Sequence, residues 1–83
     1  MNFQEVFDQL VGIIQEDLQI SIQSDIKEDT SLKELGIDSI AMMALWVYAE
    51  EKFQYETDED ALVGDQFNSI GDIANYIHQK IQD

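Results

Sequence analysis

Ser39 stands directly before an uninterrupted apolar run, Ile40 to Ala49. A helix that begins at this serine presents the hydroxyl to solvent beside the positive end of the helix dipole. Gly36 can adopt a positive φ and close the preceding turn, and the backbone N–H groups after Ser39 have no acceptors within the helix. An anion bonded to the hydroxyl is therefore well placed, and we expect Ser39 to be an attachment point for a phosphate.

The surroundings of this serine do not fit an enzyme or a metal site. Gly36-Ile37-Asp38-Ser39 is not the Gly-x-Ser-x-Gly motif of a serine hydrolase, and the one histidine, His78, is expected to be exposed near a helix end. In the stretch that begins Asp58-Glu59-Asp60, Val63 and Ser69 stand at the sixth and twelfth positions, where a calcium-binding loop requires glycine and glutamate. We therefore expect neither catalytic residues nor a bound metal. The simplest alternative to an attachment point is that Ser39 is an ordinary helix N-cap.

Two long helices are predicted near the two ends of the chain. Apolar residues recur at intervals of three and four over about residues 3–17, with Asn2 and Glu5 placed as N-cap and capping partner. Ser69 and Asp72 can cap the last helix in the same way. The apolar stripe of that last helix consists of Ile70, Ile73, Ala74, Ile77 and Ile81.

The middle of the chain predicts a long loop and two further helices. The second helix is expected over about residues 39–53, and a short third helix over residues 58–63, ended by Gly64. Between the first two helices the periodicity fails, and we expect a loop with one short turn at Leu32 to Leu35. Apolar residues spread along this loop should hold it against the core: Ile20, Ile22, Ile26, Leu32, Leu35 and Ile37. The predicted fold is all-α, a four-helix bundle of three long helices and one short.

The string Leu35-Gly36-Ile37-Asp38-Ser39-Ile40, with Glu50, Glu51 and Phe53 at the end of the same predicted helix, resembles the modification site of acyl carrier proteins. In that family the serine carries 4'-phosphopantetheine, whose thiol holds an acyl chain. The resemblance covers nearly the whole chain. It implies that Ser39 carries the arm, that Asp38 helps a phosphopantetheinyl transferase and its magnesium engage the site, and that the protein itself catalyses nothing.

Composition restricts the kinds of partner that the chain can have. Eighteen acidic residues against four lysines and no arginine give a net charge of -14, which repels nucleic acid and anionic membranes and favours basic protein surfaces. The chain has no cysteine, so any thiol chemistry must come from a cofactor. The longest apolar run is about half of the roughly 20 residues needed to cross a bilayer. We expect one cytoplasmic, monomeric carrier domain over residues 1–83.

The second predicted helix is apolar on every side, which is unusual for a surface helix. If Met42, Leu45, Trp46, Ala49 and Phe53 point inward, an outward face remains, and either the neighbouring loop covers it or partner enzymes dock there. Trp46 either borders the path of the arm and supports docking, or it fills the wall between helices. The predicted docking residues are Trp46 and the outward face itself, which consists of Ile40, Ala41, Met43, Ala44, Val47 and Tyr48.

The resemblance leaves the pathway open among polyketide or other specialised synthesis, primary fatty-acid synthesis, and aminoacyl or D-alanyl transfer. Fatty-acid carriers usually have acidic residues near the positions of Ala41 and Ala44, so these alanines favour the polyketide type. Polyketide carriers that host β-branching enzymes are similar in having a tryptophan on this helix, as Trp46 is here. The implied partners are the transferase and an acyltransferase, ketosynthase or related enzyme. Outside the class, the rival is a cofactor-free acidic helical adaptor that docks by its apolar helix.

Overall fold

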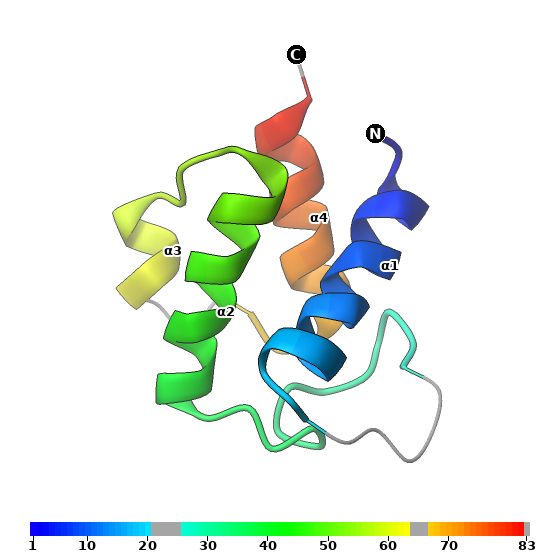
Figure 1. The fold of residues 1–83 in the computed structure, drawn as a ribbon, viewed down its shortest axis with the longest axis vertical. Helices are drawn as coiled ribbons and strands as arrows, with labels where there is room; N and C mark the ends of the chain where they lie inside the picture. Colours follow the sequence, from blue (N-terminus) through cyan, green and yellow to red (C-terminus); the bar gives the residue numbers. More distant parts are fainter. Residues whose placement is uncertain (21–25, 64–66, 83) are drawn as a thin grey trace.

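The computed structural model describes residues 1–20, 26–63 and 67–82. In chain order the elements are α1 (Phe3–Gly12), the π-helical segment η1 (Ile13–Asp17), α2 (Ser39–Phe53), α3 (Glu59–Val63) and α4 (Ile70–Ile81). The prediction of an all-α fold with three long helices, one short helix and a long first loop is confirmed. Figure 1 shows α1 beside α4 and α3 beside α2, with residues 26–38 of the long loop below the helices in this view. No strand occurs in the described ranges, where the one β-bridge joins Ser31 and Ser69.

The first helix begins at the predicted cap but changes geometry before its end. Asn2 Oδ1 accepts the Glu5 N–H at 2.8 Å, and the Asn2 N–H donates to Glu5 Oε1 at 3.1 Å, as a capping box requires. After Gly12 the helix widens into the π turn of η1, which the apolar spacing did not predict. Ile13 and Ile14 are both fully buried in this turn, although neighbours on an α-helix point about 100° apart.

The long loop is joined to the start of α4 by backbone hydrogen bonds. Ile70 N–H donates to Thr30 O at 3.1 Å, and Gly71 N–H donates to Glu28 O at 2.8 Å. In the opposite direction Leu32 N–H donates to Asn68 O at 3.0 Å. We call this pairing of residues 28–32 with 68–71 the loop clamp. It satisfies two N–H groups that have no acceptor inside a helix, so α4 begins on the loop as well as on its own cap.

The cap of α4 and the anchors of the loop agree with the sequence. Ser69 Oγ accepts the Asp72 N–H at 3.2 Å, and Asp72 Oδ2 accepts the Ser69 N–H at 3.2 Å. The predicted short turn occurs at residues 32–36. At its start the Ser31 hydroxyl accepts a hydrogen bond from the Lys33 N–H. Ile22 and Gly64, predicted as a loop anchor and as the end of the third helix, lie outside the described residues. The other predicted anchors pack in or against the core: Ile20, Ile26, Leu32, Leu35 and Ile37.

Gly71 is expected to be required where the loop clamp crosses α4. A Cβ at this position would lie 2.6 Å from the Glu28 carbonyl oxygen, so the clamp would have to open. We predict that Gly71→Ala lowers the free energy of unfolding by about 1–3 kcal/mol in urea titrations, although alanine is the better helix former by about 1 kcal/mol.

Gly12→Ala is the matched control for this substitution. A Cβ at Gly12 meets nothing within 4 Å, and the backbone there is already helical. This variant should stabilise the fold by about 0.5–1 kcal/mol. If Gly71→Ala also unfolds at or above the parental urea midpoint, the close contact in the clamp is not present in solution.

Candidate attachment site

Ser39 is the first residue of α2, and its hydroxyl takes no part in capping the helix. The N-cap is Asp38, whose backbone is extended (φ -91, ψ -171) and whose Oδ1 accepts the Ala41 N–H at 2.8 Å. Asp38 O also accepts the Met42 N–H at 2.8 Å. The reading of Ser39 as an ordinary N-cap is therefore wrong. Because the aspartate closes the helix, the exposed serine keeps its hydroxyl available for a covalent bond.

A tight turn anchored in the core brings Ser39 to the surface. Gly36 has φ 75, in the left-handed region that the sequence predicted, and its N–H donates to Lys33 O at 3.0 Å. Ile37 N–H donates to Leu32 O at 3.1 Å, and the Ile37 side chain is buried. With Ile37 held in the core, the chain turns outward and enters α2 at Ser39.

Ser39 borders a cavity of about 450 Å³ between the start of α2 and α3. Lys33, Asp38 and Ser39 supply its polar part, where α2 begins. The remaining lining is apolar and comes from the turn, from α2, from α3 and from the segment that leads into α4. It consists of Leu32, Ile37, Met42, Met43, Trp46, Ala61, Leu62 and Phe67. A group attached to Ser39 can thus turn from a charged surface into an apolar space.

Trp46 lies inside the protein and not on the outward face of α2. Its side chain is 2% exposed. Its ring meets Phe67 edge-on at a centroid distance of 5.2 Å and Tyr76 edge-on at 5.6 Å. Phe67 and Tyr76 also meet each other at 5.6 Å. The prediction of Trp46 as a residue that partners touch is corrected by this burial: the indole fills the wall between helices and reaches the cavity beside Ser39 from within.

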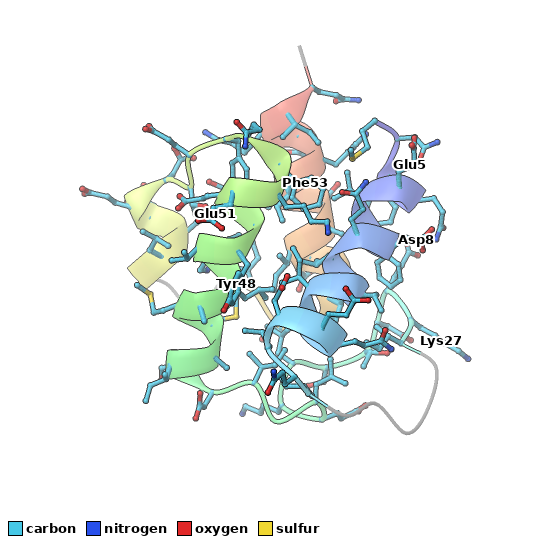
Figure 2. The ribbon with its side chains drawn as sticks, viewed as in Figure 1. Glu5, Asp8, Lys27, Tyr48, Glu51 and Phe53 are labelled. Carbon is cyan, nitrogen blue, oxygen red and sulfur yellow. The ribbon has the colours of Figure 1, made fainter. Side chains whose placement is uncertain are left out.

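The outward face of α2 is exposed to solvent at four of its side chains, which agrees with the predicted division of the helix into an inward and an outward side. Ile40 is 82% exposed, Met43 51%, Val47 52% and Tyr48 36%. Ala41 and Ala44 are partly buried. Figure 2 shows Tyr48, Glu51 and Phe53 along the second half of the helix. The predicted inward residues Leu45, Ala49 and Phe53 are buried, and Met42 is partly buried.

A second polar cluster, which the sequence did not reveal, ties α3 to α4. Asp58 bonds to Lys80 Nζ at 3.1 Å, and the Tyr76 hydroxyl donates to Asp58 Oδ2 at 2.9 Å. The same hydroxyl accepts the Asp58 N–H at 2.9 Å. Asp58 was predicted only as a helix-start residue, and its O does accept the Ala61 N–H at 3.0 Å. Its partners lie 18 and 22 residues further along, so no local pattern could identify them.

The Asp58 cluster shifts the ionisation of its members. The hydrogen bond from Tyr76, and then that from Lys80, hold the pKa of the Asp58 carboxyl below its ordinary value. Burial raises the pKa of the Tyr76 hydroxyl. His78, expected to be exposed, is instead partly buried, with its ring edge-on to Phe3 at 6.2 Å.

Among residues 1–20, 26–63 and 67–82, no three histidine, cysteine or acidic side chains come together as metal ligands would. None of the helices in those same ranges has the length and apolar character that crossing a membrane requires.

The fold and the serine site agree with what is known of related proteins. A family model described as "Phosphopantetheine attachment site" matches residues 8–77, so the chain contains such a site. The chain is 31% identical over 81 residues to an acyl carrier protein of Guillardia theta, covering 98% of each chain. It is 36% identical over 77 residues to one of Phytoplasma mali, covering 92% of this chain and 88% of the relative.

A third relative, an acyl carrier protein of Chlamydia trachomatis serovar D, is 34% identical over 74 residues, which are 88% of this chain and 92% of the relative. The chain belongs to the acyl carrier protein family. Members of this family are carriers and not catalysts, and they depend on a phosphopantetheinyl transferase and on biosynthetic partner enzymes.

The Asp58 cluster predicts a loss of stability in acid. Because the pKa of Asp58 is lowered in the folded state, its ionised form stabilises the fold above the unfolded-state pKa, and this contribution disappears as pH falls through the folded-state pKa. We expect Asp58→Asn to melt below the parent at neutral pH and the difference to shrink as the pH falls through the folded-state pKa of Asp58.

The control is Glu56→Gln, which removes an exposed carboxylate from the same segment. Its melting temperature should follow that of the parent across the titration. A difference between parent and Asp58→Asn that stays constant at every pH would show that the carboxylate charge does not stabilise the fold.

Proposed function

We propose that Ser39 is the residue that carries 4'-phosphopantetheine, and that the protein presents acyl intermediates as thioesters on this arm. The observation that carries the proposal is an exposed serine on the first turn of α2, released from capping by Asp38 and bordering an apolar cavity. Transfer breaks the pyrophosphate bond of coenzyme A and forms a phosphodiester between the Ser39 oxygen and the phosphate of the arm. Adenosine 3',5'-bisphosphate is the leaving group, and the hydroxyl proton of Ser39 leaves to solvent or to the transferase.

Electrostatics at the start of α2 support a phosphate on this oxygen. The Ala41 N–H is already bonded to Asp38, which leaves the N–H groups of Ser39 and Ile40 in the first turn without helical acceptors. These groups and the positive end of the helix dipole favour an anion at this position. Lys33 lines the same cavity and adds a positive charge to an otherwise strongly acidic protein.

Asp38 is proposed to have two roles. Its Oδ1 caps α2, while no residue in the described part of the chain bonds to its Oδ2. That second oxygen is therefore available to help a transferase and its magnesium engage the site, as the family resemblance implies. Carboxylate oxygens are the ligands that magnesium prefers in proteins, which supports this second role.

The outward face of α2 is proposed as the docking surface for partner enzymes. Its exposed members Ile40, Met43 and Val47 form an apolar strip, while the protein as a whole carries a charge of -14. A fitting partner surface has an apolar centre for this strip and basic groups around it. Among such partners we propose the phosphopantetheinyl transferase, an acyltransferase and a ketosynthase or related enzyme.

Within the family we propose a polyketide-type role, supported by Ala41 and Ala44 where fatty-acid carriers usually have acids. A link to β-branching enzymes stays a prediction. Because Trp46 is buried, it would affect such enzymes through the shape of the cavity and not by direct contact. A cytoplasmic location, a monomeric state and a single domain over residues 1–83 also stay predictions.

The assignment of Ser39 is tested by intact-mass spectrometry. Incubation with coenzyme A and a broad-specificity phosphopantetheinyl transferase should add one phosphopantetheine to the parent and none to Ser39→Ala. Ser31→Ala, which changes a serine outside α2, should be modified like the parent. An unmodified parent would favour the cofactor-free adaptor, and continued modification of Ser39→Ala would move the site elsewhere.

The two roles of Asp38 can be separated by two substitutions. Asparagine caps a helix about as well as aspartate, so Asp38→Asn should keep the parental unfolding free energy, whereas Asp38→Ala should lose about 1 kcal/mol. If the carboxylate helps engage magnesium, both variants should be modified about tenfold more slowly or worse.

The rate of phosphopantetheine transfer, followed by mass spectrometry, decides between these roles. Parental rates for Asp38→Asn would leave Asp38 as a helix cap alone.

A further inference from the structure

A buried indole, that of Trp46, lines the cavity beside Ser39, and this bears on what the arm can carry. We propose that Trp46, backed by Phe67 and Tyr76, forms a wall that limits the length of the acyl chain sheltered by the protein. The preferred cargo is then a short acyl group, and the far part of a long chain stays in solvent. This inference rests on the proposed function, because it requires an acyl group on Ser39.

The indole of Trp46 forms part of the inner surface of the cavity. Trp46 lines the cavity although it is only 2% exposed, so its ring belongs to the inner surface and not to the rim. It follows Ser39 by seven residues, which on an α-helix is a rotation of about 20° and a rise of about 10 Å. A chain that enters at Ser39 and follows α2 therefore meets the indole about two turns along.

Contacts with the rings of Phe67 and Tyr76 hold the indole of Trp46 in place. Trp46, Phe67 and Tyr76 contact one another edge-on at centroid distances of 5.2 to 5.6 Å, so no ring moves without disturbing the other two. The Tyr76 hydroxyl is bonded twice to Asp58, and Asp58 is bonded to Lys80. The ring that backs the indole is thus fastened at its polar end to the start of α3 and to the end of α4.

The space beyond the wall is unsuitable for an acyl chain. A separate hollow there is lined by Asp58, Glu59 and Asp60, together with Tyr76. Ala61 borders both this hollow and the cavity beside Ser39, so the two spaces lie close together. A methylene that passed the wall would leave an apolar lining for carboxylates and water, and would gain nothing from burial.

The experiment measures thermal stability against acyl length. The parent is loaded with acetyl, butyryl, hexanoyl, octanoyl and decanoyl groups from the corresponding acyl-coenzyme A by a broad-specificity phosphopantetheinyl transferase, and each product is checked by mass. The melting temperature should rise with chain length and then level off between butyryl and octanoyl. In Trp46→Leu the wall is lowered, and the rise should continue to longer chains.

Two further variants keep the test decisive if Trp46→Leu does not fold. Phe67→Leu removes a ring that lines the cavity and contacts Trp46, and it should also move the levelling-off to longer chains. Leu62→Phe narrows the cavity in front of an intact wall and should move it to shorter chains. Phe3→Leu is the control, because it makes the same change of an aromatic residue on α1, away from the cavity, and should keep the parental limit.

The outcomes separate this inference from the proposed function. A melting temperature that rises steadily through decanoyl in the parent, or an unchanged limit in both wall variants, overturns the wall while acyl loading on Ser39 stands. A parent that takes up no arm overturns the proposed function and the wall with it.

Discussion

The backbone hydrogen bonds of the loop clamp hold the two halves of this small protein in register. Residues 28–32 lie against residues 68–71, so the loop that leads to Ser39 is fastened to the start of α4 and not only to the apolar core. The loop carbonyls accept the N–H groups with which α4 begins, and Gly71 allows the close approach. Beyond the clamp the chain has only to complete one tight turn and bury Ile37 before it enters α2. A chain of 83 residues has a thin core, so such directional bonds position the serine more sharply than packing alone would.

At the start of α2, helix capping and the exposed hydroxyl belong to two adjacent residues. Asp38 satisfies the helix with its side chain and its carbonyl, and Ser39 is left with an exposed hydroxyl beside the dipole. The rest of α2 has one side in the core and one side exposed to solvent. Leu45, Ala49 and Phe53 join the core, while Ile40, Met43 and Val47 remain exposed. The apolar character of α2 on every side is explained by these two uses of one helix.

Features that depend on neighbouring residues were predictable from the sequence. Residue types a few positions apart in the sequence are enough to predict the helix caps at Asn2 and Ser69 and the positive φ of Gly36. The alternative that Ser39 is an ordinary N-cap could be excluded only by the structure, because Asp38 and Ser39 are both good caps. Three other features join distant parts of the chain: the loop clamp, the burial of Trp46, and the bonds from Asp58 to Tyr76 and Lys80. The π turn of η1 is a fourth feature, and it departs from ideal helical spacing. None of these features leaves a local pattern in the sequence.

The burial of Trp46 also makes the protein its own optical reporter. It is the one tryptophan in the chain, so ultraviolet excitation at long wavelength selects a single chromophore. That chromophore sits between two other rings and borders the space next to the serine. Its emission colour and intensity therefore respond to water, to neighbouring groups and to the integrity of the fold. Arrival of a tethered group, its departure to an enzyme and loss of structure can each be followed in real time without attaching a dye to the surface that partners must recognise.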